Sequence, residues 1–307
     1  MNGQKMPTLD LHQDQPIKLI LEGDSGTGKT GALPSLLYDN YKLWIMDFDN
    51  GVDIIRNILR AGAGRNPPAP QLLKQVNAVT LTDKFRVNGA RITPVSADAW
   101  SRGIGLLSKW ETFGSIEAFG PQDILVIDSL NFAGQAAMRY IQQLNNRLSV
   151  PPQIQDYRDG QILLNSLCQM LYSDSIKCNV ICLTHLREVG KREDIIDDKG
   201  RVRTIEDPAS IKSFPETGTG RALSPTIGRF FNAVLLADVV GTGQATRRII
   251  RTQPHLNIGL KNSSPGTVKS EYPLETGLAE YFRAIKFPVK TPSETEKTPN
   301  AKLLTSS

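Results

Sequence analysis

The segment GDSGTGKT, residues 23–30, combines residue types that bind phosphate. A glycine, four further residues and then Gly-Lys-Thr form a loop whose backbone N–H groups can turn inward around phosphate oxygens. Lys29 is expected to reach the β- and γ-phosphates of a nucleotide, and the Thr30 hydroxyl is expected to ligate Mg²⁺. The predicted ATP-binding residues are Gly23, Asp24, Ser25, Gly26, Thr27, Gly28, Lys29 and Thr30.

A second candidate is the aspartate that ends the aliphatic run ILVIDS, residues 124–129. A carboxylate at the tip of a buried strand, beside a phosphate loop, holds Mg²⁺ through a water molecule in other phosphate-loop ATPases. Asp128 is therefore predicted to bind the metal together with Thr30. Many of these ATPases carry the water-activating carboxylate directly after this aspartate, but Ser129 stands there, so the base must come from elsewhere.

The base is predicted to lie in LWIMDFDN, residues 43–50, which offers Asp47 and Asp49 at the tip of another strand. Asp49 lies further out, towards the nucleotide, and is predicted to orient the attacking water. The alternative is that one of the two aspartates caps the helix that starts near Val52. A fourth strand, VICLTH, ends in His185, which either senses the γ-phosphate or has a purely structural role.

These candidate site residues can meet only if the strands that carry them end side by side. The sequence predicts such strands. Near-continuous apolar runs are typical of parallel strands covered on both faces, and here they alternate with helical patterns. The predicted fold is an α/β, mostly parallel central sheet flanked by helices, with a β-rich C-terminal extension. The predicted strands are 17–22, 43–51, 123–130, 179–185, 233–241 and 245–253, and the predicted helices include 131–148 and 154–173.

The chain divides into one large domain and two terminal segments. Its predicted parts are a flexible arm over 1–15, an ATPase domain over 16–285 and a disordered tail over 286–307. One stretch inside the domain is an insertion over 61–120, least regular over 61–95, with a strand expected at NAVTL and helical spacing in DAWSRGIGLLSKWETF. The other is a mobile loop over 187–222 with a hairpin suggested by KGRVRTIE.

Charge and cysteine content indicate which partners and which compartment to expect. The 307 residues carry 36 Lys and Arg against 31 Asp and Glu, a net charge of +5 that permits a polyanionic partner without requiring one. The 3 cysteines have no metal-ligand spacing and suit a reducing cytoplasm. No signal peptide or membrane-spanning run is recognisable, so a cytoplasmic protein is expected.

Taken together, these segments resemble the core of the RecA-type ATPases. IMDFDNGVD resembles the family's second strand, whose catalytic carboxylate stands two places after an aspartate, the position of Asp49 here. LVIDS is similar to the Mg²⁺-binding strand, including the serine after Asp128. LTH stands where the family has a sensing residue before a DNA-binding loop, a position that His185 occupies.

One further segment, GLKNS at 259–263, is similar to a part of the RecA core whose lysines reach the nucleotide of a neighbouring subunit. Lys261 corresponds to one of these lysines, whereas Ser263 replaces the second. Size and layout look most like the small phage-encoded ATPases of the Sak type. That resemblance implies single-stranded DNA binding, a homo-oligomer with nucleotide at its interfaces, cooperation with a single-strand-binding protein, and a bacterial host cytoplasm.

The residues themselves support the DNA partner only in part. The loop 187–222 holds eight basic and eight acidic residues, so it has no net charge to attract a phosphate backbone. Local groups such as GKR, GRVR and RRIIR (247–251) could form a basic stripe, and a solvated face is as plausible. The leading hypothesis is a DNA-stimulated ATPase; the alternatives are a phosphate-loop kinase with 187–222 as a lid, or a slowly hydrolysing loader or structural module.

Overall fold

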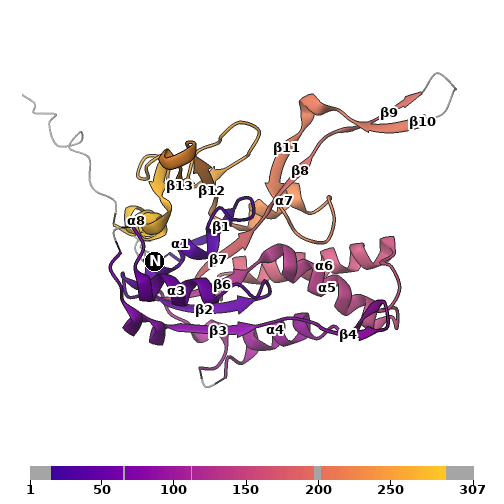
Figure 1. The fold of residues 1–307 in the computed structure, drawn as a ribbon, viewed down its shortest axis with the longest axis horizontal. Helices are drawn as coiled ribbons and strands as arrows, with labels where there is room; N and C mark the ends of the chain where they lie inside the picture. Colours follow the sequence, from indigo (N-terminus) through magenta and orange to yellow (C-terminus); the bar gives the residue numbers. More distant parts are fainter. Residues whose placement is uncertain (1–14, 65, 112, 197–201, 288–307) are drawn as a thin grey trace, which may run out of the picture.

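The computed structural model describes residues 15–64, 66–111, 113–196 and 202–287 (Figure 1). The predicted N-terminal arm and the C-terminal tail lie almost entirely outside these residues. Among the described residues, no helix is both long and apolar enough to cross a membrane.

A single large sheet organises the chain. Its strand order is β15-β13-β12-β1-β7-β6-β2-β3, and β14 pairs with β12 at one side. The strands span β1 Lys18–Glu22, β2 Lys42–Asp47, β3 Val76–Thr80, β6 Asp123–Asp128, β7 Asn179–Thr184, β12 Ala233–Val240, β13 Arg247–Arg251, β14 Lys261–Asn262 and β15 Glu271–Pro273.

The sheet is parallel from β3 to β12 and antiparallel beyond β12. The α/β fold class with a β-rich C-terminal extension is therefore confirmed. Strand β7 lies between β1, which precedes the phosphate loop, and β6, which ends in Asp128. The carboxyl ends of these parallel strands meet at one edge, where the predicted chemistry belongs.

Helices cover both faces of the sheet, because successive strand residues alternate between two cores. Leu19 and Leu21 of β1 pack in the core beneath one set of helices, and Ile20 between them packs in the other. The first set is α1 Lys29–Ala32, α2 Pro34–Leu37, α3 Asp53–Ala61 and α8 Leu274–Lys286. The second set is α4 Ala99–Ser108, α5 Leu130–Leu144, α6 Ile154–Tyr172 and α7 Ser224–Ile227.

The helix expected after the phosphate loop is divided into α1 and α2. Proline 34 has no N–H to donate to the carbonyl of Thr30, which receives a 3.3 Å bond from the Leu33 N–H instead. Pro34 then serves as the first residue of α2, a position it favours. The break lies one turn beyond Lys29 and Thr30, so it leaves their positions at the loop intact.

The stretch 61–120 contains more regular structure than the sequence predicts. Beyond strand β3 it forms a hairpin of β4, Lys84–Asn88, and β5, Arg91–Ser96, followed by α4. The hairpin was missed because its turn residues, Gly89 and Ala90, lie within a polar stretch with a weak strand pattern.

Around the stretch 187–222, the described residues of 186–196 and 202–215 form a projecting two-stranded ribbon. Strand β8, Leu186–Val189, pairs with β11, Lys212–Pro215, and further out β9, Arg192–Ile196, pairs with β10, Val202–Glu206. Figure 1 shows these strands extending away from the body of the molecule. The sequence suggested a hairpin only in its outer part; the inner pair β8–β11 was not predicted.

Candidate nucleotide site

The phosphate loop closes on itself through the side chains of its own residues. The Lys29 ammonium donates to the carbonyls of Gly23 and Asp24, at 2.8 and 2.9 Å. The Thr27 hydroxyl donates to the same Asp24 carbonyl at 2.9 Å. These bonds shape the loop and hold a buried positive charge within it, next to the space that a phosphate would occupy. Burial lowers the pKa of Lys29, and the carboxylates of Asp128, Asp24 and Asp49 oppose that change.

At Gly28 of the loop, the backbone conformation and the close surroundings both favour glycine. Its φ is +94°, a left-handed conformation that residues with a side chain rarely adopt. A Cβ atom here would lie 2.5 Å from Cδ2 of Leu274, which covers the loop from the start of α8. The glycine therefore permits both the turn and the close packing of the C-terminal helix.

The two predicted metal-binding residues contact each other directly. The Thr30 hydroxyl donates a 2.8 Å hydrogen bond to Oδ2 of Asp128, across 98 positions of sequence. Burial raises the pKa of Asp128 to about 7, and the carboxylates of Asp47 and Asp49 add to the effect, while the Thr30 bond and Lys29 oppose it. A hydroxyl and a carboxylate are hard oxygen donors that suit Mg²⁺.

These two residues fit a Mg²⁺ ion that accompanies a nucleotide. The residues that the structure describes contain no cluster of three or more His, Cys, Asp or Glu side chains able to hold a metal. A cation at Thr30 and Asp128 would therefore take its other ligands from phosphate oxygens and water, as Mg²⁺ in nucleotide sites commonly does.

The structure distinguishes between Asp47 and Asp49. Asp47 is fully buried, and its carboxylate accepts a 3.1 Å bond from the Gly51 N–H, so it holds the turn that precedes α3. Asp49 is exposed at the pocket, and its backbone N–H is held by the Asp128 carbonyl at 3.1 Å. Asp47 thus supports the turn before α3, although this helix has no side-chain cap, and the Asp49 side chain is exposed at the pocket.

His185 lies at the tip of β7, between the pocket and the ribbon. Burial lowers the pKa of its imidazole, as does the nearby Lys29 ammonium. The His185 carbonyl accepts a 2.8 Å bond from the Glu216 N–H, and the adjacent Thr184 hydroxyl donates to the Glu216 carbonyl at 2.6 Å. Because Glu216 directly follows β11, the base of the ribbon is tied to the strand that carries His185.

One cavity of about 500 Å³ collects most of the predicted residues. Its polar wall contains the phosphate loop, Asp49, Asp128 and His185, which come from four different segments of chain. Its lining also includes apolar side chains, Ile54 and Ile58 from α3 and Leu274 at the start of α8. A cavity lined by both polar groups and apolar side chains matches a nucleotide in character.

Lys261 lies apart from this cavity. Its ammonium donates to the Phe231 carbonyl of the same chain at 2.6 Å, and the residue lines a different hollow, beside β11 and α7. A single chain therefore does not bring Lys261 to its own nucleotide site, and its predicted role depends on a neighbouring subunit.

Sequence reasoning missed two charged residues of the cavity wall, Arg248 and Glu275, and the apolar lining residues Ile54, Ile58 and Leu274. Arg248 belongs to RRIIR, which the sequence suggested as part of a basic stripe for DNA. The alternation of strand β13 carried the missing information, because it separates Arg248 from Arg247 and Arg251, but it could not show which face met the phosphate loop.

Comparison with known proteins gives a likeness of fold alone. No protein-family model and no curated protein matches the sequence. Similar solved structures include a RadB recombinase, with 15% identity and a TM-score of 0.39 over 78% of this chain and 81% of that one. The flagellar accessory protein FlaH of Methanocaldococcus jannaschii has 12% identity and a TM-score of 0.40, over 86% and 89% of the two chains. A KaiC-like protein of Pyrococcus horikoshii has 12% identity and a TM-score of 0.43, over 85% and 92%. These sequence identities and TM-scores do not establish an activity for this chain.

Proposed function

We propose that this protein binds Mg²⁺-ATP in the cavity at the phosphate loop and hydrolyses it in response to single-stranded DNA. The observation that carries the proposal is the convergence of the loop, Asp128 and Asp49 on one cavity from separate strands. The apolar lining residues Ile54, Ile58 and Leu274 would pack against the nucleoside.

In the proposed reaction, a water molecule attacks the γ-phosphorus and ADP leaves. Asp49 orients this water and accepts a proton from it, so that inorganic phosphate forms, while Lys29 stabilises the charge that develops on the phosphate oxygens. When bound at Thr30 and Asp128, Mg²⁺ neutralises charge on the β- and γ-phosphates. Lys261 of an adjacent subunit would add positive charge, which would make hydrolysis depend on a homo-oligomer.

The DNA response is assigned to the ribbon formed by β8 to β11. His185 lines the cavity, and the bonds from Thr184 and to His185 join the ribbon base to that strand. A change at the γ-phosphate therefore has a short, hydrogen-bonded route to the ribbon. A single-strand-binding protein is a further proposed partner, on the strength of the sequence resemblance.

The test is ATP hydrolysis with and without single-stranded DNA, by the wild type and by a variant with a shortened ribbon. Lys191 and Asp207 lie opposite each other, because the Asp207 N–H donates to the Lys191 carbonyl at 2.9 Å. Residues 192–206 can therefore be replaced by a short Gly-Ser turn with the inner pair β8–β11 kept. The matched control shortens the other hairpin, between the paired residues Lys84 and Ser96.

We expect DNA to stimulate hydrolysis by the wild type and the control, and the shortened ribbon to keep basal hydrolysis but lose the stimulation. Hydrolysis that DNA does not change, together with no ATP-dependent DNA binding, would refute the DNA role. Transfer of phosphate to a small acceptor would favour a kinase instead, and nucleotide binding without turnover would favour a loader or structural module.

A further inference from the structure

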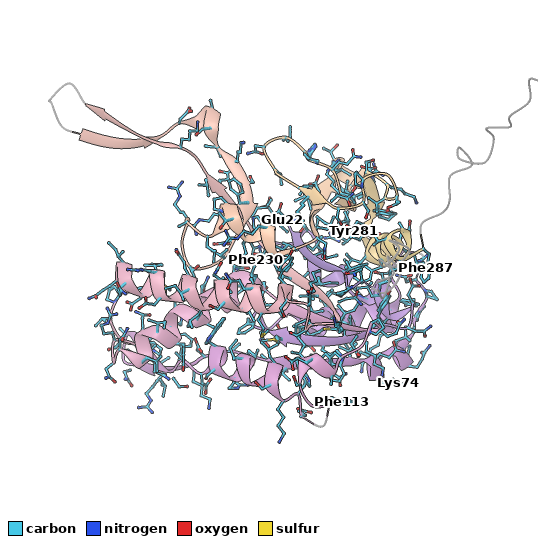
Figure 2. All side chains as sticks on the ribbon, turned by 180° about the vertical axis from the view of Figure 1, so that it is seen from behind. Glu22, Lys74, Phe113, Phe230, Tyr281 and Phe287 are labelled. Carbon is cyan, nitrogen blue, oxygen red and sulfur yellow. The ribbon has the colours of Figure 1, made fainter. Side chains whose placement is uncertain are left out.

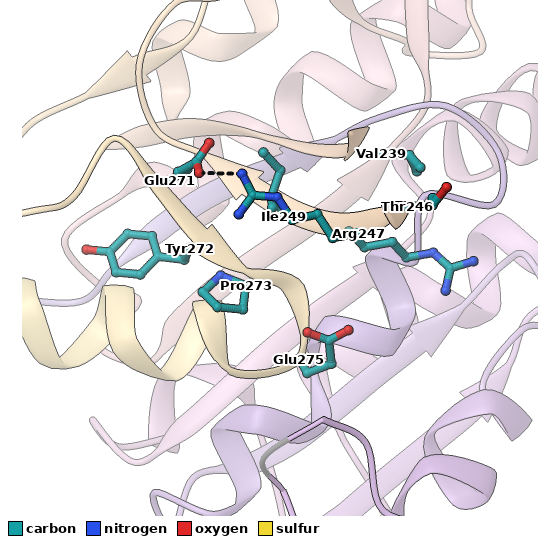
Figure 3. A pocket seen from close by; sticks show the side chains of 9 residues that line it. Val239, Thr246, Arg247, Ile249, Glu271, Tyr272, Pro273 and Glu275 are labelled. Atoms are coloured by element: carbon teal, nitrogen blue, oxygen red, sulfur yellow. Dashed lines mark hydrogen bonds and ion pairs between the residues drawn. The ribbon is translucent and has the colours of Figure 1, made fainter. Parts of the chain in front are cut away.

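Three arginines on strand β13 have different surroundings. Arg247 is paired with Glu271 at 3.1 Å, as Figure 3 shows, and Arg251 is paired with Asp238 at 2.8 Å. Arg248 has no hydrogen bond or ion pair among the residues that the structure describes. Two of the three charges are thus neutralised within the chain, and the third is available to a ligand.

The alternation of β13 explains the difference. Ile250 packs in the core that contains Leu274 and Leu278 of α8, so that face of the strand looks towards the helices around the phosphate loop. Arg248 is two positions away and shares this face, whereas Arg247 and Arg251 project from the other. Arg248 is thereby separated from Glu271 and directed to the nucleotide side of the sheet.

The Arg248 side chain lies close to the phosphate loop. A Cβ atom built on Gly28 would lie 3.3 Å from Cδ of Arg248 and 3.8 Å from its Nε. The arginine stem therefore crosses the loop at the glycine next to Lys29. Arg248 lines the nucleotide cavity and also an adjoining hollow of about 430 Å³, whose lining side chains Figure 3 displays.

Lys29, another basic residue of the cavity, occupies a different position from Arg248. The Lys29 ammonium is engaged with the carbonyls of Gly23 and Asp24, deep in the loop. A guanidinium presents several donors in a planar fork and binds phosphate in two-point geometry, which makes an unpaired arginine on a phosphate loop a fitting anion ligand.

We propose that Arg248 binds the polyphosphate chain of the nucleotide held by the phosphate loop of its own chain. This rests on the proposed function and adds to it a cation supplied within the subunit by the C-terminal sheet extension. The role is distinct from that of Lys261, which lies at a separate hollow and could reach a nucleotide only from a neighbouring subunit.

The experiment measures the dissociation constants of fluorescent ATP and ADP analogues for the wild type, Arg248→Ala, Arg248→Lys, Arg247→Ala and Lys29→Ala. Loss of a charge-assisted hydrogen bond should weaken binding of both nucleotides by about 10- to 100-fold in Arg248→Ala. Arg248→Lys should recover part of the affinity, because it keeps the charge without the fork. Arg247→Ala, the matched control on the opposite face, should stay within about twofold of the wild type.

Unchanged affinity for both nucleotides in Arg248→Ala would overturn the proposal. The same holds if that variant loses only DNA binding, which would assign Arg248 to a DNA surface. Lys29→Ala distinguishes a failure of the Arg248 proposal from a failure of the proposed nucleotide site. If Lys29→Ala loses nucleotide and Arg248→Ala does not, only the role of Arg248 fails; if neither variant loses it, the nucleotide site itself is wrong. Melting temperatures of all variants show whether each is folded, and the exposed Arg248 can be replaced without disturbing the core.

Discussion

The hydroxyl of Thr184, at the end of β7, donates a 2.6 Å hydrogen bond to the carbonyl of Glu216, the residue that follows the ribbon. Thr184 is fully buried, whereas Glu216 is half-buried, so the bond is partly buried. The Glu216 side chain also pairs with Arg187 of β8 at 3.7 Å. Glu216 thus connects the outgoing strand of the ribbon, the returning strand and the tip of the strand that carries His185.

Replacing Thr184 with valine should uncouple DNA from hydrolysis. Valine keeps the shape of threonine but removes the donor, leaving the Glu216 carbonyl without this partner, at a cost to stability of about 1–3 kcal/mol. We expect basal hydrolysis to persist while stimulation by single-stranded DNA falls, measured as the ratio of the two rates. Thr226→Val is the control, because its hydroxyl donates a local 3.1 Å bond to the carbonyl of Leu223, the residue that precedes α7. Equal stimulation in both variants would exclude Thr184 from the coupling.

Nucleotide binding that depends on Mg²⁺ should weaken at acidic pH. Burial raises the pKa of Asp128 to about 7, so below that pH its carboxyl is neutral and cannot hold the cation. The Mg²⁺-dependent part of ATP affinity should fall by up to about tenfold per pH unit below that pKa. Binding titrations of the wild type and Asp128→Asn across neutrality check this, because the variant retains the titration of ATP itself. An identical pH profile in the two proteins would contradict it.

Glu22 should make the fold less stable as the pH rises. It ends β1 (labelled in Figure 2), is fully buried, and neither carboxylate oxygen has a hydrogen-bond partner among the described residues. Burial raises its pKa from 4.5 to about 8. Between these values the unfolded chain has lost a proton that the folded chain keeps. The free energy of unfolding should therefore fall with rising pH by about 1 kcal/mol per pH unit.

The check is thermal unfolding of the wild type and Glu22→Gln over this pH range. Glutamine keeps the shape without the ionisation, so the variant should gain stability relative to the wild type as the pH rises. Glu117→Gln replaces an exposed glutamate far from Glu22 in the sequence. It should produce no pH-dependent gain in stability over the wild type. Parallel curves for wild type and Glu22→Gln would show that Glu22 does not titrate on unfolding.

Site residues that lie in short motifs or at strand ends could be predicted from the sequence. Features whose position depends on pairing between distant segments could not. The loop 23–30, Asp128 and His185 were recognisable because each directly follows an apolar strand, and parallel strands bring their carboxyl ends together. Asp49 was predicted as the water-orienting residue, but a structural role for one of the two aspartates stayed open, because it depends on the bond from the Gly51 N–H to Asp47, a feature of the folded turn.

The ribbon and Arg248 show the limit of local patterns. Strand β8 pairs with β11 across more than twenty residues, and polar, mixed-charge strands that project from the body lack the apolar alternation that marks a buried strand. Arg248 meets Gly28 only because the sheet brings β13 near β1, two strands from opposite ends of the domain.

The role of Asp49 is tested most directly by a single-turnover measurement of ATP hydrolysis on Asp49→Asn. Asn keeps the size and the polar character of the side chain but cannot accept a proton from the attacking water. The variant should bind ATP with near wild-type affinity and hydrolyse it at least about a hundredfold more slowly. Hydrolysis at the wild-type rate, by a variant that binds ATP normally, would contradict the assignment of Asp49 as the residue that orients the water.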